Sequence, residues 1–295
     1  MPMIARKLQT RISQVLGRGK SILLLGPRQT GKTTLVKLLK PDLLINLANP
    51  VERQAFEVDP SRLIREIEGL FEGKASIPLV VIDETQKVPA LLDGVQYLID
   101  EGKAQFILTG SSARKLRRDG DVNLLPGRVI VLRMDPLTVD EMADSLPSIE
   151  EILLHGSLPE IINEQSFKNR EEDLFSYVTT YLEEEVRAEA LVRQMGTFSN
   201  FLKFAALESG LISNFHKLSQ DVAISQPTIN GYYQVLVDCL IAERIEPLSQ
   251  SRTRKRLIKS PKFLIYDMGV RRVTAGEGMD VPDKYMGELF EQWVG

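Results

Sequence analysis

A glycine-rich segment near the N-terminus has the residue types and the spacing that bind a triphosphate. Gly26, Gly31, Lys32 and Thr33 follow the order G-x-x-x-x-G-K-S/T, directly after an apolar run and at the start of an amphipathic stretch. The glycines let the backbone curl with its N–H groups inward, the lysine reaches the β- and γ-phosphates, and the hydroxyl binds Mg²⁺. We therefore predict that ATP binds along one loop, which consists of Gly26, Pro27, Arg28, Gln29, Thr30, Gly31, Lys32, Thr33 and Thr34.

An acidic pair follows a second apolar run about 50 residues later. Asp83 and Glu84 come directly after Leu79–Ile82. Asp83 would share a Mg²⁺ ion with Thr33, and Glu84 would act as the general base that orients the attacking water. The alternative is a solvated turn, which is common wherever an acidic pair stands alone after a strand. Here the pair follows a phosphate loop, which favours hydrolysis of ATP.

A third apolar run, Gln105–Leu108, ends in the small polar residues Thr109-Gly110-Ser111-Ser112. Ligands of parallel sheets bind at the carboxyl ends of the strands. Thr109 or Ser111 could therefore contact the γ-phosphate or the attacking water, and we name Thr109 as a catalytic candidate. A turn of small residues explains the same text without any function.

Four arginines follow this segment, at positions 114, 117, 118 and 128. One of them could stabilise the transition state from across a subunit interface, which would make the protein a homo-oligomer. For any single one, a solvated surface arginine is the alternative interpretation. Arg128 is the preferred candidate because it stands at the start of the last predicted strand.

These residues need a parallel α/β sheet to bring them together. Short apolar runs alternate with amphipathic stretches up to about residue 132, which is typical of strands joined by crossover helices. The predicted strands are Ile22–Leu25, Leu43–Leu47, Leu79–Ile82, Phe106–Thr109 and Val129–Leu132. After Pro136 the apolar spacing becomes helical, and it predicts helices over Ser148–Leu154, Glu171–Val192 and Phe198–Leu207.

The last third of the chain has the order of elements of a winged helix-turn-helix. Two helices, Phe215–Val222 and Pro227–Leu240, precede a predicted hairpin over Arg244–Tyr266. In a DNA-binding protein of this type the second helix enters the major groove and the hairpin contacts phosphates. The phosphate contacts would come from a basic tip made of Arg252, Arg254, Lys255 and Arg256. The apolar character of Pro227–Leu240 instead favours a module that binds protein or only supports the fold.

Taken together, these segments resemble the AAA+ superfamily, in particular prokaryotic AAA-type ATPases whose P-loop domain precedes a conserved domain of unknown function. The matching text is GPRQTGKTTL, VVIDETQKVP, ILTGSSARKL, LPGRV, MDPLTVDEM, HGSLPE, RLIKSPKFLIYDMGV and GELFEQWV. The resemblance implies a strand order of 5-1-4-3-2, and it implies the roles given above for five residues, Lys32, Thr33, Asp83, Glu84 and Thr109.

On this basis we expect four regions: an ATPase core (1–136), a helical lid (137–192), a winged-helix-like domain (193–275) and the start of a further segment (276–295). Proteins of this group usually continue into a nuclease-like domain, so the chain resembles a truncated member. Its last helix, Lys284–Val294, has one apolar stripe of Met286, Leu289, Phe290 and Trp293. With nothing after it to cover this stripe, we expect self-association or a disordered C-terminus.

The composition excludes several classes of function. The net charge of -3 gives no overall basic excess for nucleic acid, and any polyanion site must be local. One cysteine and two histidines leave no internal disulfide and no zinc cluster, and no apolar run has the length of a membrane span. We therefore expect a cytoplasmic ATPase that uses Mg²⁺ and couples its nucleotide state to a partner. The alternative is a nucleotide-gated DNA- or protein-binding switch with little turnover.

Overall fold

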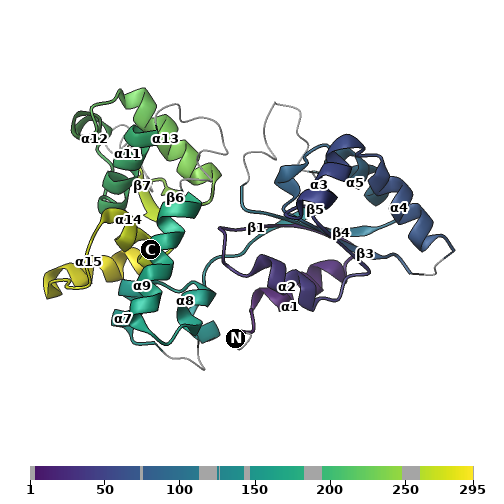
Figure 1. Ribbon diagram of the computed structural model, residues 1–295, viewed down its shortest axis with the longest axis horizontal. Helices are drawn as coiled ribbons and strands as arrows, with labels where there is room; N and C mark the ends of the chain where they lie inside the picture. The colour runs from purple at the N-terminus through teal and green to yellow at the C-terminus, as the bar shows by residue number, and fades with distance from the viewer. Residues whose placement is uncertain are drawn as a thin grey trace. The chain divides into compact units, whose positions relative to one another are not determined.

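The computed structural model describes residues 4–73, 76–112, 125, 127–142, 147–182, 195–247 and 260–294. The chain divides into two compact units (Figure 1). The first unit is Ile4–Asp135, and the second begins at Pro136. Four predicted features lie outside the described residues: the arginines at 114, 117 and 118, and the basic tip at 252–256.

The first unit is built on a five-stranded parallel sheet. Its strands are β1 (Ser21–Leu25), β2 (Leu43–Asn46), β3 (Leu79–Asp83), β4 (Gln105–Gly110) and β5 (Val129–Arg133). They lie in the order β2-β3-β4-β1-β5, which confirms the order that the resemblance implied. All five predicted strands are present, each within one residue of its predicted ends.

Helices cover both faces of this sheet (Figure 1). On one face, α1 (Leu8–Leu16) and α2 (Lys32–Leu38) pack against the alternate β1 residues Ile22 and Leu24. On the other face lie α3 (Pro50–Val58), α4 (Arg62–Phe71) and α5 (Leu91–Asp100). Because both faces are covered, each strand has a continuous apolar run, with polar residues only toward its ends.

The second unit is mainly helical and ends with a small hairpin. Its helices are α7 (Ile149–His155), α8 (Pro159–Asn163), α9 (Phe167–Ser176), α11 (Met195–Leu207), α12 (Phe215–Asp221), α13 (Gln226–Asp238), α14 (Met268–Ala275) and α15 (Asp283–Val294). The antiparallel hairpin consists of β6 (Ala242–Ile245) and β7 (Lys262–Ile265). Within the described part of the chain, no helix combines the length and the apolar character that crossing a bilayer requires.

The predicted helix over Glu171–Val192 differs from the structure. The helix begins earlier, at Phe167, and after Ser176 it continues as a π-helical segment, Tyr177–Leu182. The remainder of the prediction, residues 183–194, lies outside the described residues. The early start has a local cause, because the Ser166 hydroxyl accepts a hydrogen bond from the Asn169 N–H and caps the first turn.

Aromatic side chains form the core of the second unit. Phe198 and Phe201 of α11 pack beside Tyr233 of α13, and Tyr233 stacks on Phe263 of β7 with ring centroids 3.9 Å apart. The turn between α12 and α13 is set by Ser225, which accepts from the Thr228 N–H at the start of α13. Aromatic packing therefore holds α11, α13 and β7 together, and a capping residue fixes where α13 begins.

The expectation of an uncovered stripe on the last helix is wrong for most of its residues. Leu289 of α15 is buried against Leu153 of α7 and Met268 of α14, and Met286 and Trp293 pack around the same cluster. Of the four stripe residues, only Phe290 is exposed, at 43%. The sequence pattern identified the apolar face correctly but could not show that α7 and α14 cover it.

Candidate nucleotide-binding site

The predicted phosphate loop connects β1 to α2, and two of its glycines are required by geometry. A Cβ on Gly26 would lie 2.2 Å from the carbonyl oxygen of Met134, just after β5. Gly31 has a φ of +93°, which residues with a side chain rarely adopt. The Thr30 hydroxyl donates to the Pro27 carbonyl over 2.9 Å and closes the loop from inside. The loop can therefore pass close to β5 and still turn sharply into α2.

Lys32 is the first residue of α2, and its side chain lies back along the loop. Its Nζ donates to the carbonyl oxygens of Gly26 and Pro27, over 2.8 and 2.7 Å. The ammonium group is buried at the mouth of the loop, where a phosphate chain would pass. This position suits a cation that exchanges carbonyl partners for phosphate oxygens.

Thr33 and Asp83 meet across the sheet edge. The Thr33 hydroxyl donates to Oδ2 of Asp83 over 2.7 Å, although the two residues are 50 positions apart. Mg²⁺ prefers hard oxygen ligands and binds through one or two protein groups, together with phosphate and water. The donor set fits that pattern, because it consists of one hydroxyl oxygen and one carboxylate oxygen. Thr33 and Asp83 are the residues that would hold the ion.

Glu84 follows Asp83 in a left-handed backbone conformation, with φ of 61° and ψ of 43°. This conformation is uncommon for a residue with a side chain, and such residues cluster at functional sites. The Glu84 N–H donates to the Thr109 hydroxyl over 3.1 Å. The same hydroxyl donates to Oδ1 of Asp83, so one threonine of β4 fixes both acidic residues. Contact of Thr109 with the γ-phosphate stays a prediction.

Gln86 is a member of this site that the sequence analysis missed. It lies in a short turn, Thr85–Lys87, and its side chain is buried. Its amide nitrogen donates to Oε2 of Glu84 over 2.6 Å and contacts the Ser111 hydroxyl at 2.9 Å. The only sequence signal was its position two residues after Glu84, which does not distinguish it from a solvated glutamine.

Arg6 is the second residue that sequence reasoning missed. Its guanidinium donates to the Thr30 carbonyl over 2.6 Å and to the Asp135 carbonyl over 2.7 Å. Arg6 therefore ties the phosphate loop to the residue at which the first unit ends. No motif marks it, because both partners are backbone groups and one lies 129 positions away.

Arg128 is not brought together with the other predicted site residues. It precedes β5, and the sheet register pairs Ser21 with Val129 and Leu25 with Arg133. Arg128 thus lies at the amino edge of the sheet, opposite the phosphate loop, where it forms a two-pronged ion pair with Asp100. It does not reach the site of its own chain, and its action across a subunit interface stays a prediction.

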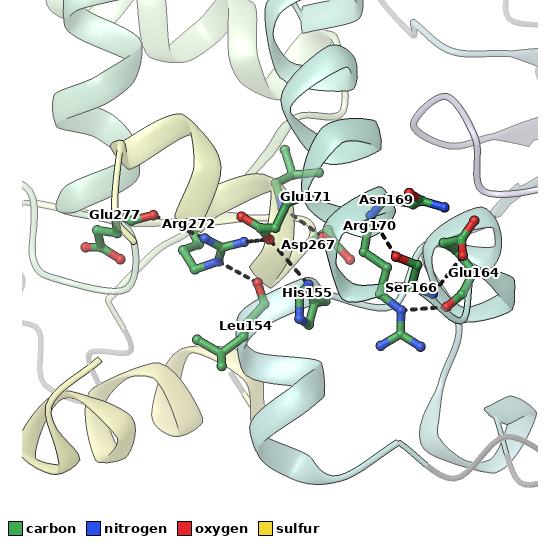
Figure 2. Close-up of polar contacts among 11 residues, drawn as sticks. Leu154, His155, Glu164, Ser166, Asn169, Arg170, Glu171, Asp267, Arg272 and Glu277 are labelled. Atoms are coloured by element: carbon green, nitrogen blue, oxygen red, sulfur yellow. Dashed lines mark hydrogen bonds and ion pairs between the residues drawn. The ribbon is translucent and has the colours of Figure 1, made fainter. Parts of the chain in front are cut away.

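A second polar cluster lies inside the second unit (Figure 2). Arg272 of α14 is 2% exposed; it ion-pairs with Glu171 of α9 and donates to the Leu154 carbonyl over 2.6 Å. His155 lies beside Glu171, with Nδ1 3.4 Å from Oε1. Burial lowers the pKa of His155, and Glu171 opposes that shift only in part. This cluster joins α7, α9 and α14, so a structural role explains its contacts.

Asp267 connects two of the matching sequence segments, HGSLPE and IYDMGV. Its carboxylate accepts from the Ser157 N–H over 2.7 Å and, as the cap of α14, from the Val270 N–H over 3.0 Å. A side chain on Gly156 would collide with this carboxylate, and one on Gly269 would collide with the His155 carbonyl. Both glycines are therefore required by close packing. Burial raises the pKa of Asp267 to about 6, and the N–H donors oppose this shift only in part.

Comparison with protein families also divides the chain into two parts, at a point within ten residues of the boundary between the two compact units. Residues 18–143 match the family model of an AAA domain. Residues 146–280 match the model of a domain of unknown function, DUF8612. The chain thus carries an AAA domain, which is a P-loop nucleotide-binding domain, followed by a domain of unknown function.

Similar proteins are known from sequence and from structure. The uncharacterized proteins Rv2008c of Mycobacterium tuberculosis and Mb2031c of Mycobacterium bovis are each 27% identical over 270 residues, which is 90% of this chain. The match spans only 58% of those relatives. Two solved structures, Aeropyrum pernix ORC1 in complex with DNA and Pyrobaculum aerophilum Cdc6p, each align over 98% of this chain and 95% of theirs, at 13% and 15% identity and a TM-score of 0.37.

Proposed function

We propose that this chain binds ATP in its first unit and hydrolyses it with Mg²⁺. One observation carries the proposal: a cation, a hydroxyl and a carboxylate lie together at the carboxyl edge of β1 and β3. These groups belong to Lys32, Thr33 and Asp83, and the AAA domain supplies the nucleotide-binding fold. Glu84 follows Asp83 directly with a left-handed backbone, a conformation that clusters at functional sites, which supports hydrolysis over binding alone.

The mechanism assigns one task to each group. Lys32 would leave the carbonyls of Gly26 and Pro27 and neutralise charge on the β- and γ-phosphates. Thr33 and Asp83 would hold Mg²⁺, which when bound neutralises phosphate charge. Glu84 would accept a proton from the attacking water as the water oxygen bonds to the γ-phosphorus and the bond from that phosphorus to the β–γ bridging oxygen breaks, which releases ADP. Thr109 keeps Asp83 and Glu84 in fixed positions relative to each other.

An ATPase assay with a Lys32→Ala blank tests this proposal. The parent chain should release phosphate from ATP in the presence of Mg²⁺, and the blank should neither bind a fluorescent ATP analogue nor release phosphate. Removing Mg²⁺ with a chelator should stop turnover. ATP binding by Lys32→Ala with the parent's affinity would contradict the assigned role of the loop.

We further propose that the second unit transmits the nucleotide state to a partner. Within it we assign a helical lid to 137–192 and a winged-helix-like module to 193–275, where α11, α12 and α13 precede the β6–β7 hairpin. The segment at 276–295 remains a separate region in this proposal. The order of helices and strands supports this assignment, together with the antiparallel bridge between Ile212 and Lys262, which adds a second pairing beside the hairpin.

Duplex DNA is a candidate partner because of the exposed face of α13. Gln226, Asn230 and Gln234 are exposed and lie four residues apart, so they share one side of the helix. Asn and Gln are the side chains that read adenine through two hydrogen bonds in the major groove. The apolar residues that argued against base reading, such as Ile229 and Leu236, are in the core. A protein partner remains the alternative.

Titration with labelled duplex DNA at several salt concentrations separates the two partners. If α13 reads bases, Asn230→Ala should weaken binding, whereas Asn200→Ala, at an exposed position of α11, should not. The affinity should also fall steeply as salt is added, because released counterions accompany phosphate contacts. No binding at low salt would leave a protein as the partner.

A further inference from the structure

We propose that Gln86 is a positioning residue that holds the carboxylate of Glu84 in place for catalysis. The inference rests on the proposed ATP hydrolysis, and it extends the site by one residue that no motif assigns. Gln86 would not touch the nucleotide. It would act through Glu84, by restricting the directions in which that carboxylate can point.

The hydrogen bonds of Gln86 carry the argument. Its amide nitrogen has two N–H groups, and two partners lie within reach: Oε2 of Glu84 at 2.6 Å and the Ser111 hydroxyl at 2.9 Å. Gln86 therefore links the loop after β3 to the loop after β4, one residue beyond Gly110. With Oε2 of Glu84 engaged, Oε1 is the oxygen left to accept a proton from water.

Burial makes this link specific. Gln86 is 6% exposed, whereas Glu84 is only partly buried, so the glutamine is the more restricted partner of the two. The Gln86 side-chain oxygen is buried and accepts no hydrogen bond from any described residue. The amide is thus held through its nitrogen alone. A reversed amide would bring its oxygen toward the Glu84 carboxylate, and the two acceptors would repel each other.

The backbone around Glu84 explains why such a partner is needed. The left-handed turn at Glu84 fixes the start of the side chain, and the Glu84 N–H is held by Thr109. The long side chain beyond Cβ still has rotamer freedom. A base that must meet a water molecule in line with the γ-phosphate benefits from losing that freedom before the reaction.

Gln86→Met tests the inference, because methionine has nearly the same length and volume but donates no hydrogen bond. We expect kcat to fall at least tenfold while the affinity for ATP changes less than twofold. The matched control is Gln54→Met, at an exposed position of α3, which should behave like the parent chain. Ser111→Ala removes the second partner of the amide and should lower kcat less than Gln86→Met does.

The pH dependence of turnover distinguishes positioning from a general loss of structure. Gln86→Glu keeps the side-chain length but places an acceptor against Glu84. Its activity relative to the parent should rise as the pH is lowered, because one carboxylic acid can then donate to the other carboxylate. A misfolded site would lose activity at every pH and would lose ATP binding as well.

The outcomes separate this inference from the function on which it rests. If the parent chain releases no phosphate from ATP, the proposed hydrolysis is overturned and the inference fails with it. If the parent hydrolyses ATP and Gln86→Met turns over at the parent's rate, only the inference is overturned. A higher kcat in Gln86→Met would also overturn it, since Gln86 would then restrain Glu84 and not position it.

Discussion

At the scale of single residues, the proposed mechanism separates groups that bind from a group that reacts. Lys32, Thr33 and Asp83 contact backbone or each other, and all three would meet phosphate or metal. Glu84 has neither role in the proposal, and its Oε2 accepts a hydrogen bond from Gln86. We therefore assign the proton transfer to its carboxylate, and metal binding to Thr33 and Asp83.

Glu84→Gln should separate binding from chemistry. Glutamine keeps the shape of the side chain but cannot accept the proton of the attacking water, so turnover should fall by about 10² or more while ATP stays bound. Single-turnover measurement of phosphate release, beside equilibrium binding of ATP, gives both quantities. Lys32→Ala is the contrasting variant, since it should lose both. Turnover of Glu84→Gln at the parent's rate would exclude Glu84 as the base.

At the scale of elements, the phosphate loop depends on its contact with the segment after β5. Gly26 passes so close to the Met134 carbonyl that no side chain fits between them. The Met134 N–H in turn donates to the Leu25 carbonyl over 2.8 Å, at the end of β1. The glycine is therefore required where β1, the loop and β5 meet, in addition to any contact with phosphate.

Gly26→Ala should destabilise the first unit and abolish ATP binding together. The added Cβ, 2.2 Å from a backbone oxygen, must push the loop away from β5, and strain of this kind costs about 1–3 kcal/mol or more. Gly69→Ala is the matched control. Gly69 lies within α4 with open space around its Cβ position, so alanine should stabilise the chain by about 0.5–1 kcal/mol. Urea unfolding of the three proteins measures both effects.

The elements were largely predictable from the sequence, and several contacts between them were not. Each strand of the parallel sheet is a local apolar run between polar turns, so its ends could be placed within one residue. Gln86 and Arg6 act through partners that only the fold brings near, such as Ser111 and Asp135. Arg128 was predicted as a site residue from its position at the start of the last strand. The direction of β5, which the sequence does not show, instead places it at the amino edge of the sheet.

The buried carboxyl group of Asp267 should make the stability of the second unit depend on pH. Burial raises its folded-state pKa to about 6, so between about pH 4 and pH 6 the folded chain holds a proton that the unfolded chain has lost. The stabilisation from this proton is complete below about pH 4 and disappears as the pH rises through 6. One pKa unit corresponds to about 1.4 kcal/mol, which is the loss we expect between pH 5 and pH 8.

Asp267→Asn provides the reference, because asparagine does not titrate. The free energy of unfolding of the parent minus that of Asp267→Asn should fall by about 1.4 kcal/mol from pH 5 to pH 8. His155 also makes stability depend on pH, in the opposite direction, because its pKa is lowered. This contribution is present in both proteins, so it cancels in the difference. The fluorescence of Trp293, the only tryptophan, reports the second unit. If the parent instead gains stability relative to Asp267→Asn as the pH rises, the N–H donors lower the pKa of Asp267 by more than burial raises it.

At the scale of the whole molecule, one short segment is positioned to connect the two units. Gly26 of the phosphate loop packs against Met134, and Arg6 donates both to the Thr30 carbonyl of the loop and to the Asp135 carbonyl, so the loop is linked to the last two residues of the first unit. Two residues later the Leu137 N–H donates to the Ser157 carbonyl over 2.9 Å. Ser157 is in turn held by Asp267. A loop that shifts on binding phosphate would therefore act directly on the chain that enters the second unit.

This connection predicts that ATP stabilises the second unit as well as the first. Bound ATP at 100 times its dissociation constant stabilises the state it binds by about 2.7 kcal/mol. If the units are coupled, part of this energy, about 1–2 kcal/mol, should appear in the second unit. The unfolding midpoint followed by Trp293 should then rise when ATP and Mg²⁺ are added to the parent chain, and it should not change in Lys32→Ala. Hydrogen exchange in β1 and β4 measures stabilisation of the first unit in the same samples. Slower exchange in these strands with an unchanged Trp293 midpoint would show that ATP binds without coupling, and the second unit would then need another way to receive the nucleotide state.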